Sequence, residues 1–219
     1  MSFSPPQLDL NQLRIRSLTD RHSLTRVDEI LVNPLSPAPS IATSMAGAIA
    51  DCARRIRSAR NRGAAVFLIY GAHLLRNGAA RIVRELLAQK WITHIATNGA
   101  GSIHDWEYAW GGASTERVEE NVASGTFGMW QETATCIHAA ILTGALDGLG
   151  YGASVGRFIA ENGVCIPPAS LLESQLVAEP RHPLASARAD MLDALATGQL
   201  REGPLAVTVT SWRARRPGH

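Results

Sequence analysis

Two segments rich in apolar residues stand out in the pattern of hydrophobic and polar positions along this chain of 219 residues. Residues 64–69 are apolar without alternation, which is typical of a strand covered on both faces in a parallel sheet, and residues 91–97 predict a second buried strand. Between them, apolar residues spaced by three and four positions predict a helix over 74–89. This connection is too long for a hairpin, so the two strands should be parallel and joined by a right-handed crossover. The sequence therefore predicts a strand–helix–strand unit over 63–105.

Helical periodicity continues on both sides of this unit. Residues 41–61 predict a helix, and Ser114 is expected to cap another that runs to about residue 121. Residues 1–40 are rich in proline and serine and predict an extended arm, so a single domain is expected over 41–219. Further helices are expected at 103–111, 129–143 and 153–161 and after Pro167-Pro168 and Pro183, and a third and last strand at 205–210.

Composition narrows the classes of partner. The net charge of +2 gives no reason to expect nucleic acid, and no apolar stretch approaches the ~20 residues of a membrane span. The N-terminus lacks the basic start and apolar run of a secretion signal, so we expect a cytoplasmic protein without membrane contact. Cys52, Cys136 and Cys165 lack the spacing of metal ligands, which fits free thiols in a reducing compartment. Among 21 basic residues only Lys90 is a lysine, so chemistry that needs a lysine has one candidate.

The turns after the two strands carry the first candidate chemistry. Gly71-Ala72-His73 follows the first strand, and Asn98-Gly99-Ala100-Gly101 follows the second. In parallel α/β sheets ligands bind beyond the carboxyl ends of the strands, where glycine lets the backbone approach a phosphate and a helix start offers unpaired N–H groups. Neither turn is a full G-x-G-x-x-G fingerprint. The pair of turns on adjacent strands nevertheless predicts a site for a nucleotide or a related cofactor.

A histidine and two carboxylates follow the second turn directly, and three interpretations of them stay open. His104 can transfer protons, because the pKa of a histidine can be tuned near neutrality. Asp105 and Glu107 can bind a cationic amine or orient His104. A metal held by His73, His94, His104 and Asp105 is the third interpretation, although their spacing is unlike that of known sites and we expect no metal. His94, in mid-strand, is expected to be a packed histidine.

Glu132 is a further candidate. It lies in the first turn of the helix predicted over 129–143, just after the glycine-flanked loop 125–128. An acidic residue at this position compensates the helix dipole. Because a glycine loop precedes it directly, we also include Glu132 among the candidate site residues.

Four segments of the chain occur in the same order in a known family: Gly71-Ala72-His73-Leu74-Leu75-Arg76-Asn77-Gly78, Thr93-His94-Ile95-Ala96-Thr97-Asn98-Gly99-Ala100-Gly101-Ser102-Ile103-His104-Asp105, Ser114-Thr115-Glu116-x-Val118 and Gly125-Thr126-Phe127-Gly128-Met129-x-x-Glu132-Thr133. On these segments the chain resembles the deoxyhypusine synthase superfamily, and it is closest to the bacterial deoxyhypusine synthase-like branch. The resemblance covers about residues 60–160 well and the flanks loosely.

The resemblance implies an α/β fold with a short Rossmann-like parallel sheet and extra C-terminal helices, NAD as the cofactor, and a homotetramer. The synthases oxidise spermidine with NAD and pass an aminobutyl group through an enzyme imine to a target lysine. By the same resemblance, His104 and Asp105 lie where the synthases carry acidic residues beside the cofactor. The candidate cofactor-binding residues are Gly71, Ala72 and His73 at the first turn, Thr97, Asn98 and Gly99 at the second, and Gly101 of the same glycine-rich turn.

Two main hypotheses about function follow. The first is an enzyme that oxidises an amine or polyamine-like substrate with NAD, in which His104 transfers protons and Asp105, Glu107 and Glu132 complete the site. The second is a non-catalytic or half-complete subunit that forms a hetero-oligomer with a complementary chain, because Lys90 lacks the glycine-rich C-terminal context of the synthases' lysine. A hydrolase or metal enzyme built on two histidines is a third alternative.

Overall fold

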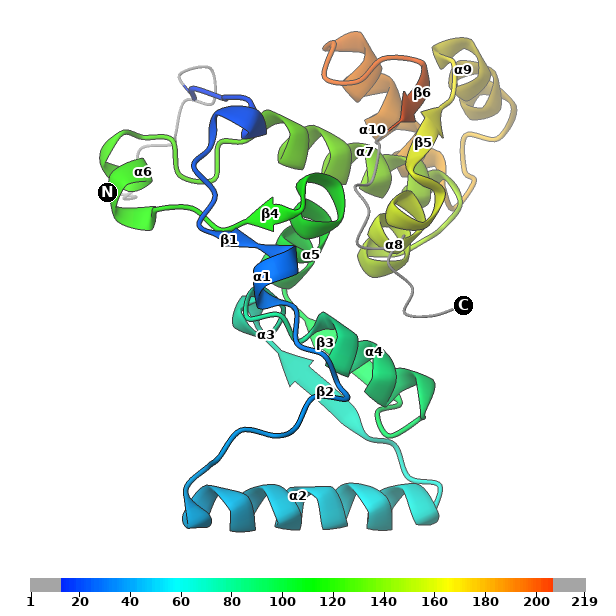
Figure 1. Cartoon of the computed structure of the whole chain (residues 1–219). Coiled ribbons are helices and arrows are strands. Elements are labelled where there is room, and N and C mark those ends of the chain that lie inside the picture. Colours follow the sequence, from blue (N-terminus) through cyan, green and yellow to red (C-terminus); the bar gives the residue numbers. More distant parts are fainter. Residues whose placement is uncertain (1–12, 207–219) are drawn as a thin grey trace, which may run out of the picture. The chain divides into compact units, whose positions relative to one another are not determined.

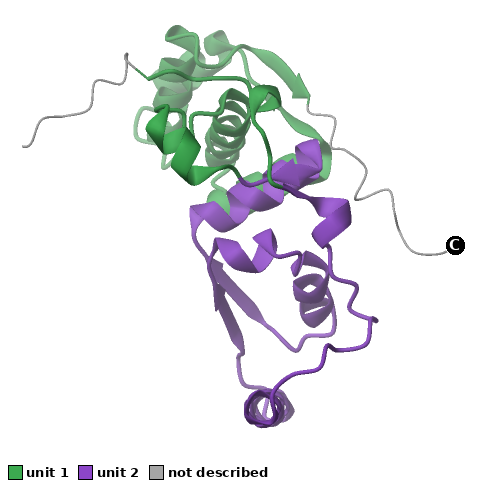
Figure 2. Ribbon diagram, turned by 60° about the vertical axis from the view of Figure 1, so that its left-hand side comes forward, with its two compact units in different colours: residues 1–24, 116–209 green, residues 25–115, 210–219 purple. Residues whose placement is uncertain are grey.

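The structure, a computed structural model, describes residues 13–206, which form two compact units (Figures 1 and 2). Residues 25–115 form one unit, here called the strand-pair unit, and residues 13–24 and 116–206 form the other, here called the helical unit. The fold is mixed α/β, with six short strands in three two-stranded sheets among the described residues, where the sequence predicted three strands. Parts of the predicted arm and of the last predicted strand lie outside the described residues, and the single domain over 41–219 stays a prediction.

The strand-pair unit contains the predicted parallel strands. β2 (Phe67–Tyr70) and β3 (His94–Thr97) pair in parallel, with Phe67 opposite His94 and Tyr70 opposite Thr97. Helices connect them, as the length of the intervening segment predicts. The other elements of this unit are β1 (Thr25–Arg26), α1 (Val27–Ile30), α2 (Thr43–Asn61), α3 (Ala72–Arg76), α4 (Ala80–Ala88), α5 (Gly99–Gly111) and β4 (Ala113–Ser114), and β1 pairs with β4 in an antiparallel sense.

The helix predicted over 74–89 is interrupted at Gly78. This buried glycine has a φ of 83°, a conformation that L side chains rarely adopt. A Cβ at this position would overlap the carbonyl oxygen of Ile30, and the N–H of Val32 donates to the Gly78 carbonyl at 3.0 Å. The segment after α1 therefore lies directly against the backbone between α3 and α4, and only glycine permits this approach.

The strands β2 and β3 are not covered on both faces, and this part of the sequence prediction is wrong. The side chains of Phe67, Ile69 and Ile95 are 60%, 78% and 39% exposed. The predicted helix over 41–61 does form, as α2, but Met45 and Ile49 of its apolar stripe are also exposed. An apolar run indicates that a strand is suited to burial, but it does not show whether the covering layer belongs to the same chain or to another one.

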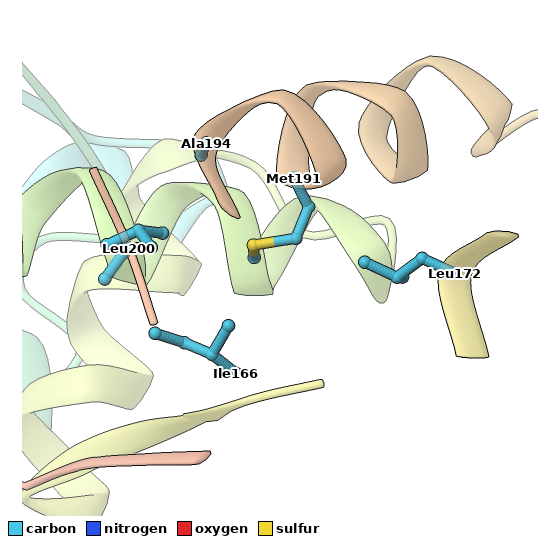
Figure 3. Packing of buried hydrophobic residues seen from close by; sticks show 6 residues of the cluster. Ile166, Leu172, Met191, Ala194 and Leu200 are labelled. Atoms are coloured by element: carbon cyan, nitrogen blue, oxygen red, sulfur yellow. The ribbon is translucent and has the colours of Figure 1, made fainter. Parts of the chain in front are cut away.

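The helical unit is built around α7 (Gln131–Leu146). This helix packs against α8 (Tyr151–Glu161), α10 (Ala185–Ala196) and β5 (Gly163–Ile166), which confirms the extra C-terminal helices. The core side chains Ile166, Leu172, Met191, Ala194 and Leu200 converge from these elements and their neighbours (Figure 3). The unit also contains the 3-10 helix η2 (Leu18–Asp20), α6 (Val118–Ala123), α9 (Ala169–Ala178) and β6 (Gly203–Ala206), which pairs with β5 in an antiparallel sense.

No helix in the described part of the chain combines the length and the apolar character that crossing a membrane requires.

Candidate functional site

The two predicted turns lie side by side at the carboxyl edge of the β2–β3 pair. Tyr70 and Thr97 are partners in the parallel register, so the turns that follow them begin at the same level. Gly71 is the N-cap of α3, with an extended backbone. Asn98 is the N-cap of α5, and its side-chain oxygen accepts a hydrogen bond from the Gly101 N–H at 3.2 Å. The structure thus brings together the two segments that the sequence singled out for cofactor binding.

An open hollow of about 400 Å³ lies at the first turn. Gly71, His73 and Asn77 contribute to its lining. A Cβ at Gly71 would touch no other atom, so the backbone of this residue faces open space, and the side chain of His73 is exposed. The volume falls within the range of small-molecule sites. The first turn therefore has room for part of a nucleotide, and its exposed backbone suits a phosphate.

Gly101, in the second turn, packs closely against the strands, whereas Gly71 in the first turn faces open space. A Cβ on Gly101 would lie 2.5 Å from Oγ1 of Thr97 and 3.6 Å from Cε2 of Tyr70. Glycine at this position thus allows the first turn of α5 to approach the strands closely, as the last glycine of dinucleotide-binding turns does. Asn98 and Gly99, just before it, are exposed, so the start of α5 faces solvent with its positive dipole end.

Tyr70 and Asp105 add two ionisable groups at the same edge. Burial raises the pKa of the Tyr70 hydroxyl, the carboxylate of Asp105 raises it further, and a hydrogen bond with the Thr97 side chain opposes them. The phenol therefore stays protonated and serves as a hydrogen-bond donor at neutral pH. Because Asp105 acts electrostatically on Tyr70, these two side chains and Thr97 form one polar group at the end of the strand pair.

His104 belongs to a hydrogen-bonded chain that also includes a buried carboxylate. Its Nδ1 lies 2.7 Å from the hydroxyl of Ser114, and this hydroxyl donates to the carboxylate of Glu107. Ser114 is completely buried and Glu107 is only 2% exposed. His104 and Glu107 are three positions apart on α5 and therefore share a face of the helix.

The direction of these hydrogen bonds determines the tautomer of the histidine. Ser114 has one hydroxyl proton, and the Glu107 carboxylate accepts it. The Ser114 oxygen must then accept from Nδ1 of His104, which places the proton of the neutral ring on Nδ1 and its lone pair on Nε2. A carboxylate that orients a histidine in this way also stabilises the imidazolium, which is the arrangement of a general base.

A second set of buried hydroxyls fixes the position of Ser114. The Thr25 hydroxyl donates to the Ser114 carbonyl at 3.0 Å and lies 2.7 Å from the Tyr108 hydroxyl and 3.0 Å from that of Thr115. Thr115 is buried with a φ of 65°, a strained conformation for a β-branched residue. Ser114 is therefore a residue of β4 and not the predicted helix N-cap, since α6 begins only at Val118.

The buried carboxylate makes Ser114 important for stability as well. We expect Ser114→Ala to lower the free energy of unfolding by about 1–3 kcal/mol, because Glu107 loses a donor that water cannot replace. Urea unfolding measures this difference. Ser58→Ala, on the exposed surface of α2, is the matched control and should change stability by less than about 0.5 kcal/mol. Equal effects of the two substitutions would contradict the hydrogen-bonded chain.

Glu132 lies in the helical unit, whereas the other three candidate catalytic residues lie in the strand-pair unit. Its carboxylate accepts a hydrogen bond from the Ser17 hydroxyl at 2.6 Å and another from the Leu18 N–H at 2.5 Å. Burial opposes ionisation, but these hydrogen bonds outweigh it and lower the pKa of Glu132 below its usual value of 4.5. The structure gives Glu132 a clear task, which is to hold the start of η2 against α7, and its part in catalysis stays a prediction.

The lowered pKa of Glu132 makes this contact sensitive to acid. Its contribution to stability is complete above the unfolded pKa of about 4.5 and is lost as the pH falls through the lower folded pKa. Between pH 6 and pH 3, the free energy of unfolding of Glu132→Gln should therefore decrease by about 1 kcal/mol less than that of the unsubstituted protein. Glu161→Gln, at an exposed position, should show the same decrease in unfolding free energy as the unsubstituted protein. Urea unfolding at both pH values checks this, and identical behaviour of the two variants would contradict it.

His94 is exposed at the start of β3, where its ring stacks on Phe67 with 4.4 Å between centroids, so it is not a packed core histidine. Within residues 13–206, no three His, Cys, Asp or Glu side chains gather as metal ligands do. Cys136 is buried, and burial together with the neighbouring Glu132 raises the pKa of its thiol to about 11.

Sequence reasoning missed Tyr70 and Ser114 as site residues. Tyr70 immediately precedes the first glycine turn, which is a usable signal, because the last residue of a strand in a parallel sheet lies beside the ligand edge. Ser114 lies ten positions after His104, beyond the end of α5, and the periodicity of a helix does not extend across such a turn.

Comparison of the chain with protein-family models finds no match, and comparisons with curated proteins and with solved structures also find none.

Proposed function

We propose that this chain binds NAD at the carboxyl edge of β2–β3 and oxidises an amine or polyamine-like substrate. The observation that carries the proposal is the pair of turns at one level of a parallel strand pair, together with an oriented histidine on the helix that begins at the second turn. The resemblance to the deoxyhypusine synthase superfamily supports the choice of cofactor and substrate class. A Rossmann-like character of the strand pair is part of the same proposal.

The residues of the two turns fit a dinucleotide. Gly71, Ala72 and His73 would hold one part of it at the hollow, while Thr97, Asn98, Gly99 and Gly101 would present the start of α5 to its phosphates. Held by these residues, NAD would supply a hydride acceptor for the oxidation of the amine.

The side chains that follow the second turn would handle the substrate and its proton. Nε2 of His104 would take the proton that the amine nitrogen releases as the hydride leaves, and Glu107 would stabilise the resulting imidazolium through Ser114. Glu107 is too deeply buried to touch a substrate, so it is a positioning residue. The half-buried Asp105 is the carboxylate that we assign to the substrate ammonium group.

Thermal unfolding with NAD tests the cofactor site. NAD at about ten times its Kd should add about 1.4 kcal/mol of stability and raise Tm by about 3–5 °C. Gly71→Val should abolish this shift without lowering the Tm of the free protein, because a side chain at Gly71 meets only open space and its φ of −103° suits valine. Gly47→Val, at an equally open position on α2, should keep the shift. No shift with millimolar NAD would refute the proposal.

The exposed apolar strands favour a second candidate function, that of a subunit completed by another chain. A two-stranded sheet is marginally stable alone, and the apolar side chains of Phe67, Ile69 and Ile95 are those of a sheet that another layer covers. A homo-oligomer, or a hetero-oligomer with a complementary subunit, would supply that layer. Sedimentation velocity of the purified chain gives its oligomeric state, and the absorbance of NADH gives its activity. An active homo-oligomer supports the enzyme, and an inactive monomer supports the half-complete subunit.

A further inference from the structure

An open cavity of about 400 Å³ lies entirely within the helical unit and has no part in the proposed NAD site. Its wall combines apolar side chains, Leu171 and Leu172 of α9 among them, with charged side chains from α8, from α10 and from Asp147, the C-cap of α7. Arg157 and Asp147 are paired to each other at 2.6 Å and balance in charge. The remaining charged residues of the wall are the cation Arg188 and the anion Glu161.

Arg188 is a buried cation with weak partners. The residue is 9% exposed. Its polar contacts among the described residues are one hydrogen bond to the Gln175 carbonyl, at the long distance of 3.4 Å, and one carboxylate oxygen of Glu179 at 3.6 Å. Glu179 is itself well exposed, so water screens its charge. A guanidinium has five N–H donors, and a buried charge normally has close, hydrogen-bonded partners.

The geometry points to a binding site for a small monocarboxylate with an apolar body, anchored by Arg188. Guanidinium and carboxylate form two parallel hydrogen bonds, and the leucines of the wall would cover the apolar body. A dianion such as a phosphate monoester is less suited, because the carboxylate of Glu161 lies in the same wall. This site takes a different class of ligand from the proposed NAD site and does not depend on it.

Protection of Cys165 from alkylation tests the proposal in the unmodified protein. Cys165 is exposed and lines the cavity, whereas Cys52 is exposed in the strand-pair unit and serves as an internal control. The probe is phenylacetate, with its neutral analogue phenylacetamide as the matched ligand. Phenylacetate should halve the rate at which iodoacetamide modifies Cys165 at about 1 mM and leave Cys52 unchanged, while phenylacetamide should be at least about tenfold weaker. Mass spectrometry of the two peptides measures both rates.

Three substitutions then test whether Arg188 binds the carboxylate within this cavity. Arg188→Gln should weaken protection by phenylacetate about tenfold or more, whereas Arg181→Gln, which removes the same charge from an exposed position, should change it less than about twofold. Leu171→Trp fills the cavity from a partly exposed position and should abolish protection even if the Arg188 variant does not fold. Equal protection by the acid and the amide, no protection at about 10 mM, or equal effects of the two arginine substitutions would overturn the proposal.

Discussion

The variant His104→Ala is expected to keep the thermal shift with NAD and to lose spermidine-dependent formation of NADH by a factor of about 10²–10⁴. The proposed function assigns this histidine the proton that leaves the amine nitrogen, and the hydrogen-bonded chain to Glu107 prepares its ring for that task. His104 lies outside the two turns, so its removal should leave the proposed cofactor site intact. The absorbance of NADH measures turnover, and thermal unfolding in the same buffer shows whether the variant is folded.

A control and a rescue separate catalysis from structure in this experiment. His138→Ala, on the exposed face of α7, should retain full turnover. Added imidazole should restore part of the activity of His104→Ala, because a free base can occupy the vacated space, and a structural defect would not respond in this way. Full activity of the variant, or a loss that imidazole leaves unchanged together with a lowered Tm, would remove His104 from the proposed mechanism.

Replacement of Gly78 by alanine should lower the free energy of unfolding by about 3 kcal/mol or more, which corresponds to a decrease in Tm of about 6–12 °C. Two effects combine at this position. A φ of 83° is strained for alanine, and the new Cβ would overlap the backbone oxygen of Ile30, which cannot rotate away as a side chain can. Thermal unfolding of the free protein measures the change.

Two other glycines of the same unit separate these effects. Gly63 has a φ of 69° but open space around it, so Gly63→Ala should cost about 1 kcal/mol for the backbone conformation alone. Gly71 has an ordinary φ and open space, so Gly71→Ala should change stability by less than about 0.5 kcal/mol. If Gly78→Ala is no worse than Gly63→Ala, the close approach of Ile30 does not occur.

The sequence predicted well what depends on local pattern. Two segments rich in apolar residues, with a helical segment between them, are sufficient to predict β2, β3 and their parallel pairing. The two glycine turns follow directly after these segments. The helices after residue 130 also appear close to their expected places, because a proline or glycine lies shortly before the start of each.

The errors have a common physical cause, which is contact between segments far apart in the chain. The break at Gly78 depends on Ile30, and the position of Ser114 in β4 depends on its pairing with Thr25. Neither partner can be identified from the periodicity of the segment in which the error occurs. The exposed strands are a further case, because hydrophobicity measures suitability for burial and does not identify the covering surface.

The discontinuous make-up of the helical unit has a consequence for the order of events during synthesis on the ribosome. The described part of the strand-pair unit is one continuous stretch, residues 25–115, and all of it leaves the exit tunnel before α7 does. Residues 13–24 emerge earlier but belong with α7, and the hydrogen bond from Ser17 to Glu132 joins residues 115 positions apart. Residues 13–24 therefore cannot form their contacts with α7 until the whole strand-pair unit has been translated. We expect a chaperone to bind the nascent chain during this interval.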